Sequence, residues 1–134
     1  MGVQRRLIVP LAALASVVGL AACGEDDFEN NPRPPAPIEL SARIGTDAVT
    51  VSPADVGAGV ATITISNQTP DPARLVLEGP TDEASDEILA GGTGSVKVVL
   101  EEGDYAVSDG ESQRQTALVV GPERESSQND LLLP

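Results

Sequence analysis

The chain has 134 residues and a net charge of −13, with 21 acidic residues, eight basic residues and no histidine. Because so acidic a protein repels phosphate backbones and anionic headgroups, we expect no nucleic-acid partner. The absence of histidine, together with a single cysteine, removes a necessary part of serine triads, cysteine–histidine pairs and zinc sites. We therefore expect a protein that is not an enzyme.

The first 22 residues have the layout of an export signal. Arg5 and Arg6 precede an uncharged stretch, Leu7–Ala22, that ends in small residues, which is the order of a secretory signal peptide. The stretch is shorter than the roughly 20 apolar residues that a spanning helix needs. We expect residues 1–22 to be removed on export, by either the general secretory or the twin-arginine route.

The segment Leu20-Ala21-Ala22-Cys23 resembles the bacterial lipobox. The resemblance implies diacylglyceryl transfer to the Cys23 sulfur, cleavage before Cys23, and acylation of the new amino terminus, for example with palmitate. Two or three acyl chains, at about 0.8 kcal/mol per buried methylene, hold a protein stably on a bilayer. We therefore expect a lipoprotein on the outer face of the bacterial cell membrane, in contact with the membrane through this lipid. As the only cysteine, Cys23 excludes a disulfide within the chain.

Residues 23–37 predict a tether between the lipid and a domain. The segment opens with acidic residues and then becomes proline-rich, at Pro32, Pro34, Pro35 and Pro37. Proline-rich chains favour extended geometry and act as semi-rigid spacers. With Arg5 and Arg6 removed, the remaining six basic and 21 acidic residues give a net charge of −15. A spacer would hold such an acidic domain away from anionic headgroups.

Residues 38–121 predict a single all-β domain. Seven short segments alternate apolar and polar residues or are rich in β-branched residues, and turn-forming residues separate them. The predicted strands are residues 38–44, 48–51, 59–67, 74–78, 96–100, 105–107 and 116–120. No segment strongly predicts a helix. Seven short strands in this length favour a Greek-key β-sandwich, and residues 122–134 predict a disordered tail.

One motif in this domain predicts a structural device. Leu100-Glu101-Glu102-Gly103-Asp104-Tyr105 matches the Leu-x-x-Gly-x-Tyr pattern of a tyrosine corner. In that device the tyrosine hydroxyl bonds to backbone a few residues upstream. We therefore expect structural roles for Leu100, Gly103 and Tyr105.

The order of several segments resembles the cupredoxin-like domains of secreted bacterial proteins. The matching segments are Val49-Thr50-Val51, Val60–Asn67, Gly91–Ser95 and Gly103–Tyr105. The resemblance implies a cupredoxin-like sandwich over most of the predicted domain. An immunoglobulin-like sandwich is the alternative, because other Greek-key folds share these motifs.

The copper ligands of cupredoxins are missing from the chain. That family binds copper through two histidines, a cysteine and usually a methionine. Ala73 or Arg74 stands at the position matched to the first histidine, Asp109 is the nearest match to the cysteine, and the only methionine is Met1. A blue copper site needs imidazole and thiolate ligands. We therefore expect a binding or structural module with no cofactor, whose protein or small-molecule partner the sequence does not identify.

An acidic loop supplies the alternative function. Asp82, Glu83, Asp86 and Glu87 lie between two predicted strands. Carboxylate oxygens are suitable ligands for Ca²⁺, although the spacing is not that of an EF-hand. The alternative is a calcium-dependent binding domain that uses residues 82–87, whereas a solvated loop is the simpler interpretation.

Overall fold

The computed structural model describes residues 33–111 and 113–126 of the chain. The expected signal peptide, the lipobox with Cys23, the start of the tether and residues 127–134 lie outside the described residues. Among the residues described, no helix is long and apolar enough to cross a membrane.

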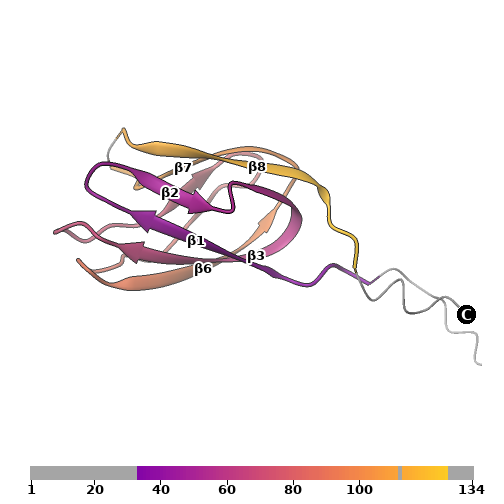
Figure 1. Cartoon of the computed structure of the whole chain (residues 1–134), viewed down its shortest axis with the longest axis horizontal. Coiled ribbons are helices and arrows are strands. Elements are labelled where there is room, and N and C mark those ends of the chain that lie inside the picture. Colours follow the sequence, from indigo (N-terminus) through magenta and orange to yellow (C-terminus); the bar gives the residue numbers. More distant parts are fainter. Residues whose placement is uncertain (1–32, 112, 127–134) are drawn as a thin grey trace, which may run out of the picture.

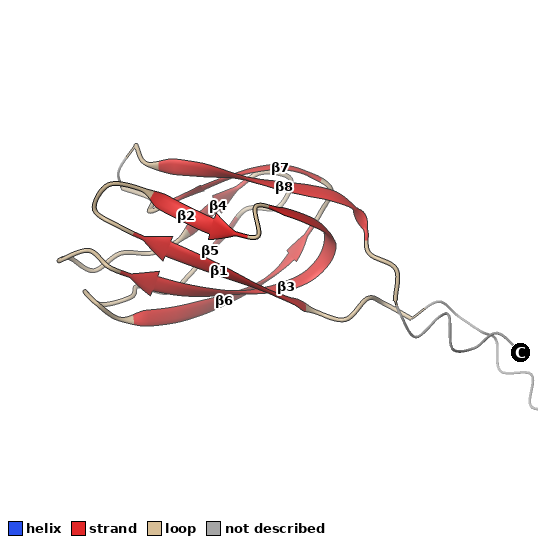
Figure 2. Ribbon diagram, viewed as in Figure 1, coloured by secondary structure: helices blue, strands red, loops and turns tan. Residues whose placement is uncertain are grey.

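The described chain is all β (Figure 2). Its strands are β1 Ile38–Ile44, β2 Val49–Ser52, β3 Asp55–Asn67, β4 Val76–Glu78, β5 Glu83–Ala84, β6 Thr93–Leu100, β7 Gly103–Ser108 and β8 Gln115–Glu123. Each of the seven predicted strands corresponds to one of these, and the two-residue strand β5 is additional. The all-β prediction is thereby confirmed.

The strands form two packed layers that share the long strand β3 (Figure 1). One layer has the order β2-β1-β3-β6, and the other has the order β3-β8-β7-β4-β5. The first part of β3 pairs in parallel with β8, whereas its second part lies between β1 and β6. A register shift between Gly57 and Ala58 marks the change of layer.

Most strand boundaries differ from those expected from the sequence, and two of these differences affect the architecture. Strand β3 begins at Asp55 rather than at residue 59, because its first residues pair with β8 although they show no clear alternation. Strand β8 continues to Glu123, past the domain boundary expected at residue 121. The described chain then runs on to Ser126, which is buried.

The core lies between the two layers and consists of aliphatic side chains at alternate strand positions. Its fully buried members include Leu40, Ile44, Ile63, Ile65, Leu75, Leu77, Leu100, Val107 and Leu118. Burial of each such large side chain stabilises the fold by roughly 1.5–3 kcal/mol. Tyr105 is the one aromatic side chain among the described residues, and it is also buried in this core.

Tyr105 has the geometry of a tyrosine corner. Its side chain comes from β7 and is 1% exposed. Its hydroxyl oxygen accepts a hydrogen bond of 3.0 Å from the backbone N–H of Glu101, four residues upstream. Gly103 has a φ of +147°, a conformation that favours glycine, at the turn between these two residues. Leu100 lies in the core at the end of β6.

Candidate functional site

The candidate site lies at the end of the sandwich opposite the two described chain ends. The two ends of the described chain leave the domain at one end of the sandwich, where the expected tether joins it (Figure 1). Strands β1 and β3 finish side by side at the other end, where Ile44 pairs with Asn67. We call this second end, formed by the connections 45–48, 68–75 and 85–92 and by residues 109–111 and 113–114, the distal end.

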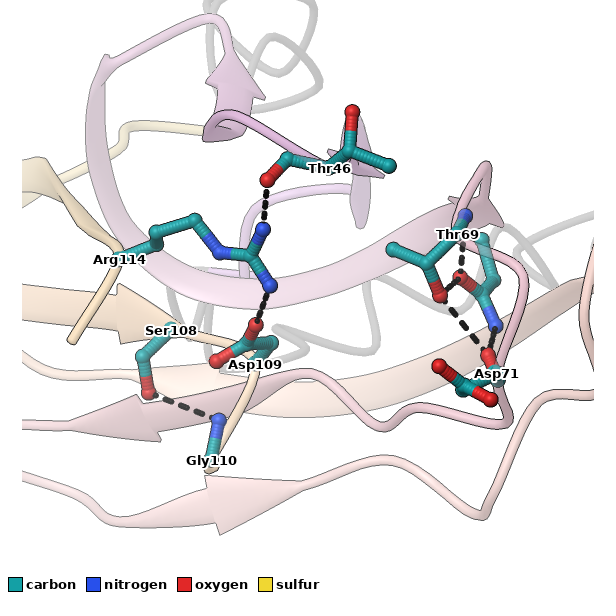
Figure 3. Close-up of polar contacts among 8 residues, drawn as sticks. Thr46, Thr69, Asp71, Ser108, Asp109, Gly110 and Arg114 are labelled. Atoms are coloured by element: carbon teal, nitrogen blue, oxygen red, sulfur yellow. Dashed lines mark hydrogen bonds and ion pairs between the residues drawn. The ribbon is translucent and has the colours of Figure 1, made fainter. Parts of the chain in front are cut away.

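The guanidinium group of Arg114 forms an ion pair and bridges the two layers at the distal end (Figure 3). The Nη2 atom of Arg114 lies 2.9 Å from Oδ2 of Asp109, whose side chain is only 6% exposed. The Nη1 atom of Arg114 donates a hydrogen bond to the carbonyl oxygen of Thr46, in the connection between β1 and β2. One guanidinium group therefore joins the β7–β8 connection to a loop of the opposite layer.

A second polar network is centred on Asn67, the last residue of β3. This side chain is fully buried, and its Nδ2 atom donates to the carbonyl oxygens of Asp71, Ile88 and Leu89 at 2.8, 3.0 and 3.2 Å. Its Oδ1 atom accepts a hydrogen bond of 3.0 Å from the backbone N–H of Thr69 (Figure 3). A buried amide needs partners of this kind, and here they hold two distal loops together.

A pocket of about 220 Å³ opens at the distal end. Its lining residues are Thr69, Asp71, Pro72, Ala73, Asp109, Glu111 and Arg114. The structure thus brings together Ala73 and Asp109, two of the positions matched to copper ligands, whereas Arg74 is exposed and does not line the pocket. The pocket is smaller than most ligand sites.

The chemistry of this pocket differs from that of a copper site. Its charged groups are carboxylates and one guanidinium, and none of its lining residues is histidine or cysteine. The buried carboxylate of Asp109 is paired with Arg114. What the arrangement does directly is to hold loops from both layers in fixed positions.

Two carboxylates of the acidic loop accept hydrogen bonds from nearby backbone. The Oδ1 atom of Asp82 accepts a hydrogen bond of 3.0 Å from Gly79 N–H, and Oε1 of Glu83 accepts one of 3.1 Å from Ala84 N–H. Asp86 and Glu87 are exposed. Within residues 33–111 and 113–126, no group of three or more acidic, histidine or cysteine residues is placed to hold a metal ion.

The sequence analysis missed Arg114 and Thr46 as members of the candidate site. The two residues are far apart in the chain, and only the packing of the two layers brings them together. The sequence does indicate a turn at Ser108-Asp109-Gly110, where Gly110 has a φ of +75°. This turn marks the start of the connection that carries Arg114. A lone arginine in a loop gives no indication of its partner.

The fold is that of a cupredoxin-like β-sandwich, and comparison with known proteins supports this class. No family model and no curated protein matches the sequence. Among solved structures, the chain is similar to auracyanin A, a blue copper protein from Chloroflexus aurantiacus, with a TM-score of 0.50 and 15% identity over 64% of this chain and 100% of that one. It is also similar to auracyanin B, with a TM-score of 0.51 and 19% identity over 67% of this chain and 92% of that one. The predicted cupredoxin-like sandwich is confirmed, in preference to the immunoglobulin-like alternative.

Proposed function

We propose that the chain is a lipid-anchored, non-catalytic protein of the bacterial cell envelope, and that its cupredoxin-like module works without copper. The observation that carries the copper-free part of this proposal is the Asp109–Arg114 ion pair. It lies beside Ala73 in one pocket, so that two positions matched to copper ligands hold side chains that do not suit copper. The same Arg114 guanidinium also joins the β7–β8 connection to the one between β1 and β2, because its Nη1 atom donates to the carbonyl oxygen of Thr46.

The positions of the chain ends also support an orientation of the module relative to the membrane. The two ends of the described chain lie at the end of the sandwich opposite the distal loops (Figure 1). A lipid on Cys23 would therefore leave the distal end facing away from the membrane. The negative charge of the domain also favours separation from the membrane surface, because anionic headgroups repel it. The distal loops are then the part most accessible to a protein or small-molecule partner.

Copper titration tests whether the module works without copper. Cu(II) is added to the purified full chain while the visible absorption spectrum is recorded, with auracyanin A as the positive control. We expect no intense thiolate-to-copper band, because the described pocket offers neither imidazole nor thiolate. Appearance of such a band at one equivalent of copper would show that the copper-free assignment is wrong.

Replacement of Cys23 tests the proposed lipid anchor. We expect Cys23→Ser to move the protein from the detergent phase to the aqueous phase, or to leave an uncleaved precursor, because serine provides no sulfur for the lipid. Asn30→Ser serves as the control, since it adds serine at another position of the tether, and it should partition like the natural chain. Retention of Cys23→Ser in the mature, detergent-soluble fraction would overturn the anchoring proposal.

A further inference from the structure

Arg124 lies across β3 at the end of the domain where the chain enters and leaves. It follows directly after β8. Its Nε atom donates to the carbonyl oxygens of Gly57 and Ala58 at 3.2 and 3.3 Å, and its Nη2 atom donates to that of Val60 at 2.9 Å. The side chain thus binds the backbone of β3 over the stretch where that strand changes layer.

Two glycines make room for this arginine. A Cβ atom at residue 57 would lie 2.4 Å from Cγ of Arg124, and a Cβ atom at residue 59 would lie 2.7 Å from its Nη2 atom. Both distances are shorter than real contacts of a Cβ atom allow. Gly57 and Gly59 therefore form a slot along β3 that the Arg124 side chain fills.

The same guanidinium also binds the residues that lead into β1. Its Nη1 atom donates a hydrogen bond of 2.8 Å to the carbonyl oxygen of Ala36. Pro35 lies over the same slot, since its Cγ atom would be 3.3 Å from a Cβ atom at Gly59. Arg124 therefore joins three segments that are distant in sequence: the end of the tether, β3 and the segment after β8.

We propose that Arg124 is a clasp that makes the end of the tether part of the folded domain, so that residues 35–36 stay on β3 only while this guanidinium is in place. The clasp itself does not depend on lipidation. Its consequence, a fixed direction of the domain above the membrane, rests on the proposed lipid anchor.

The backbone N–H of Ala36 is the reporter for this clasp, because the prolines on either side have none. Order parameters are measured by ¹⁵N relaxation on the full chain in detergent micelles, for the natural sequence, Arg124→Met and Arg43→Met. Methionine keeps much of the aliphatic stem but removes the guanidinium. Arg43 is an exposed arginine of β1, so its replacement removes the same charge at a position outside the clasp.

We expect Ala36 to show an order parameter of about 0.85 in the natural chain and in Arg43→Met, and one below about 0.6 in Arg124→Met. An Ala36 value unchanged by Arg124→Met, or a value already below about 0.6 in the natural chain, overturns the clasp. An equal fall of the Ala36 order parameter in Arg43→Met also overturns the clasp, since the fall would then come from the loss of a positive charge alone.

A measurement on the natural chain keeps the proposal testable even where Arg124→Met fails to fold. The Nε–H group of Arg124 donates hydrogen bonds to two carbonyl oxygens. Its proton should therefore exchange with water at least tenfold more slowly than the Nε–H proton of Arg43. Equal exchange rates contradict the clasp. Detergent partitioning of the same samples reports lipidation separately, so that failure of the anchor is distinguished from failure of the clasp.

Discussion

The backbone of Gly79 lies directly against the ring of Tyr105, because a Cβ atom at residue 79 would be 2.7 Å from Cδ1 of that ring. The next residue, Pro80, covers the turn of the tyrosine corner, where its Cγ atom would be 2.6 Å from a Cβ atom at Gly103. The segment after β4 therefore closes over the only buried aromatic ring among the described residues. Neither glycine leaves space for a side chain.

We expect Gly79→Ala to lower the free energy of unfolding by about 1–3 kcal/mol, since the new methyl group must displace the Tyr105 ring or the backbone. Urea titration measures the change. Gly121→Ala is the matched control, because a Cβ atom there would meet only an ordinary contact of 3.7 Å with the carbonyl oxygen of Val56. It should change stability by less than about 0.5 kcal/mol. Equal effects at the two glycines would contradict the close packing at residue 79.

Tyr105→Phe isolates the hydroxyl group of the tyrosine corner. The ring stays in the core, but the backbone N–H of Glu101 loses its partner. Because this hydrogen bond is partly buried, we expect the free energy of unfolding to fall by about 1–2 kcal/mol, measured by the same titration. A phenylalanine variant as stable as the natural chain would show that the hydrogen bond contributes nothing.

The Asp109–Arg114 pair can be tested by a double-mutant cycle with Asp109→Asn, Arg114→Met and the two combined. We expect a coupling energy of about 1–3 kcal/mol, intermediate between exposed and buried pairs, because Asp109 is buried while the Arg114 side chain is 33% exposed. Thermal or urea unfolding of the four proteins gives this value. A coupling energy below about 0.5 kcal/mol would mean that the two residues are merely neighbours.

Calcium should change the melting temperature of the chain by less than about two degrees. A site occupied at one hundred times its dissociation constant would add about 2.7 kcal/mol, and hence a rise of roughly ten degrees or more. Asp82 and Glu83 instead accept backbone hydrogen bonds through a carboxylate oxygen. A rise of ten degrees that disappears in Asp82→Asn with Asp86→Asn would establish a calcium site in this loop.

The sequence predicted those parts of the fold whose side chains alternate between core and solvent. Strand β1 has the predicted bounds, because Leu40, Ala42 and Ile44 face the core between exposed neighbours. The second part of β3 also alternates and was predicted. The first part was not, since Gly57 interrupts the alternation there and Gly59 stands at its end. Their lack of a side chain is explained by Arg124, which only the folded structure places there.

The candidate site was predictable in position but not in its interactions. The match to cupredoxin-like domains placed Ala73 or Arg74, and Asp109, at ligand positions, and the structure shows Ala73 and Asp109 lining one pocket. The bond from Arg114 to Thr46 joins two layers, and no local pattern of the sequence encodes such a contact. Residues whose contacts depend on long-range packing therefore could not be predicted from the sequence, whereas residues whose positions follow from the order of the strands could.

Sharing β3 between both layers ties the completion of the fold to the last strand of the chain. Asp55 and Val56 pair with Val119 and Val120 of β8, and contacts so distant in sequence form slowly because a long loop must first close. The early part of β3 has no strand partner among the described residues until β8 is in place. Closure of the sandwich therefore waits for β8, and a chain truncated before β8 leaves an open strand edge that favours aggregation.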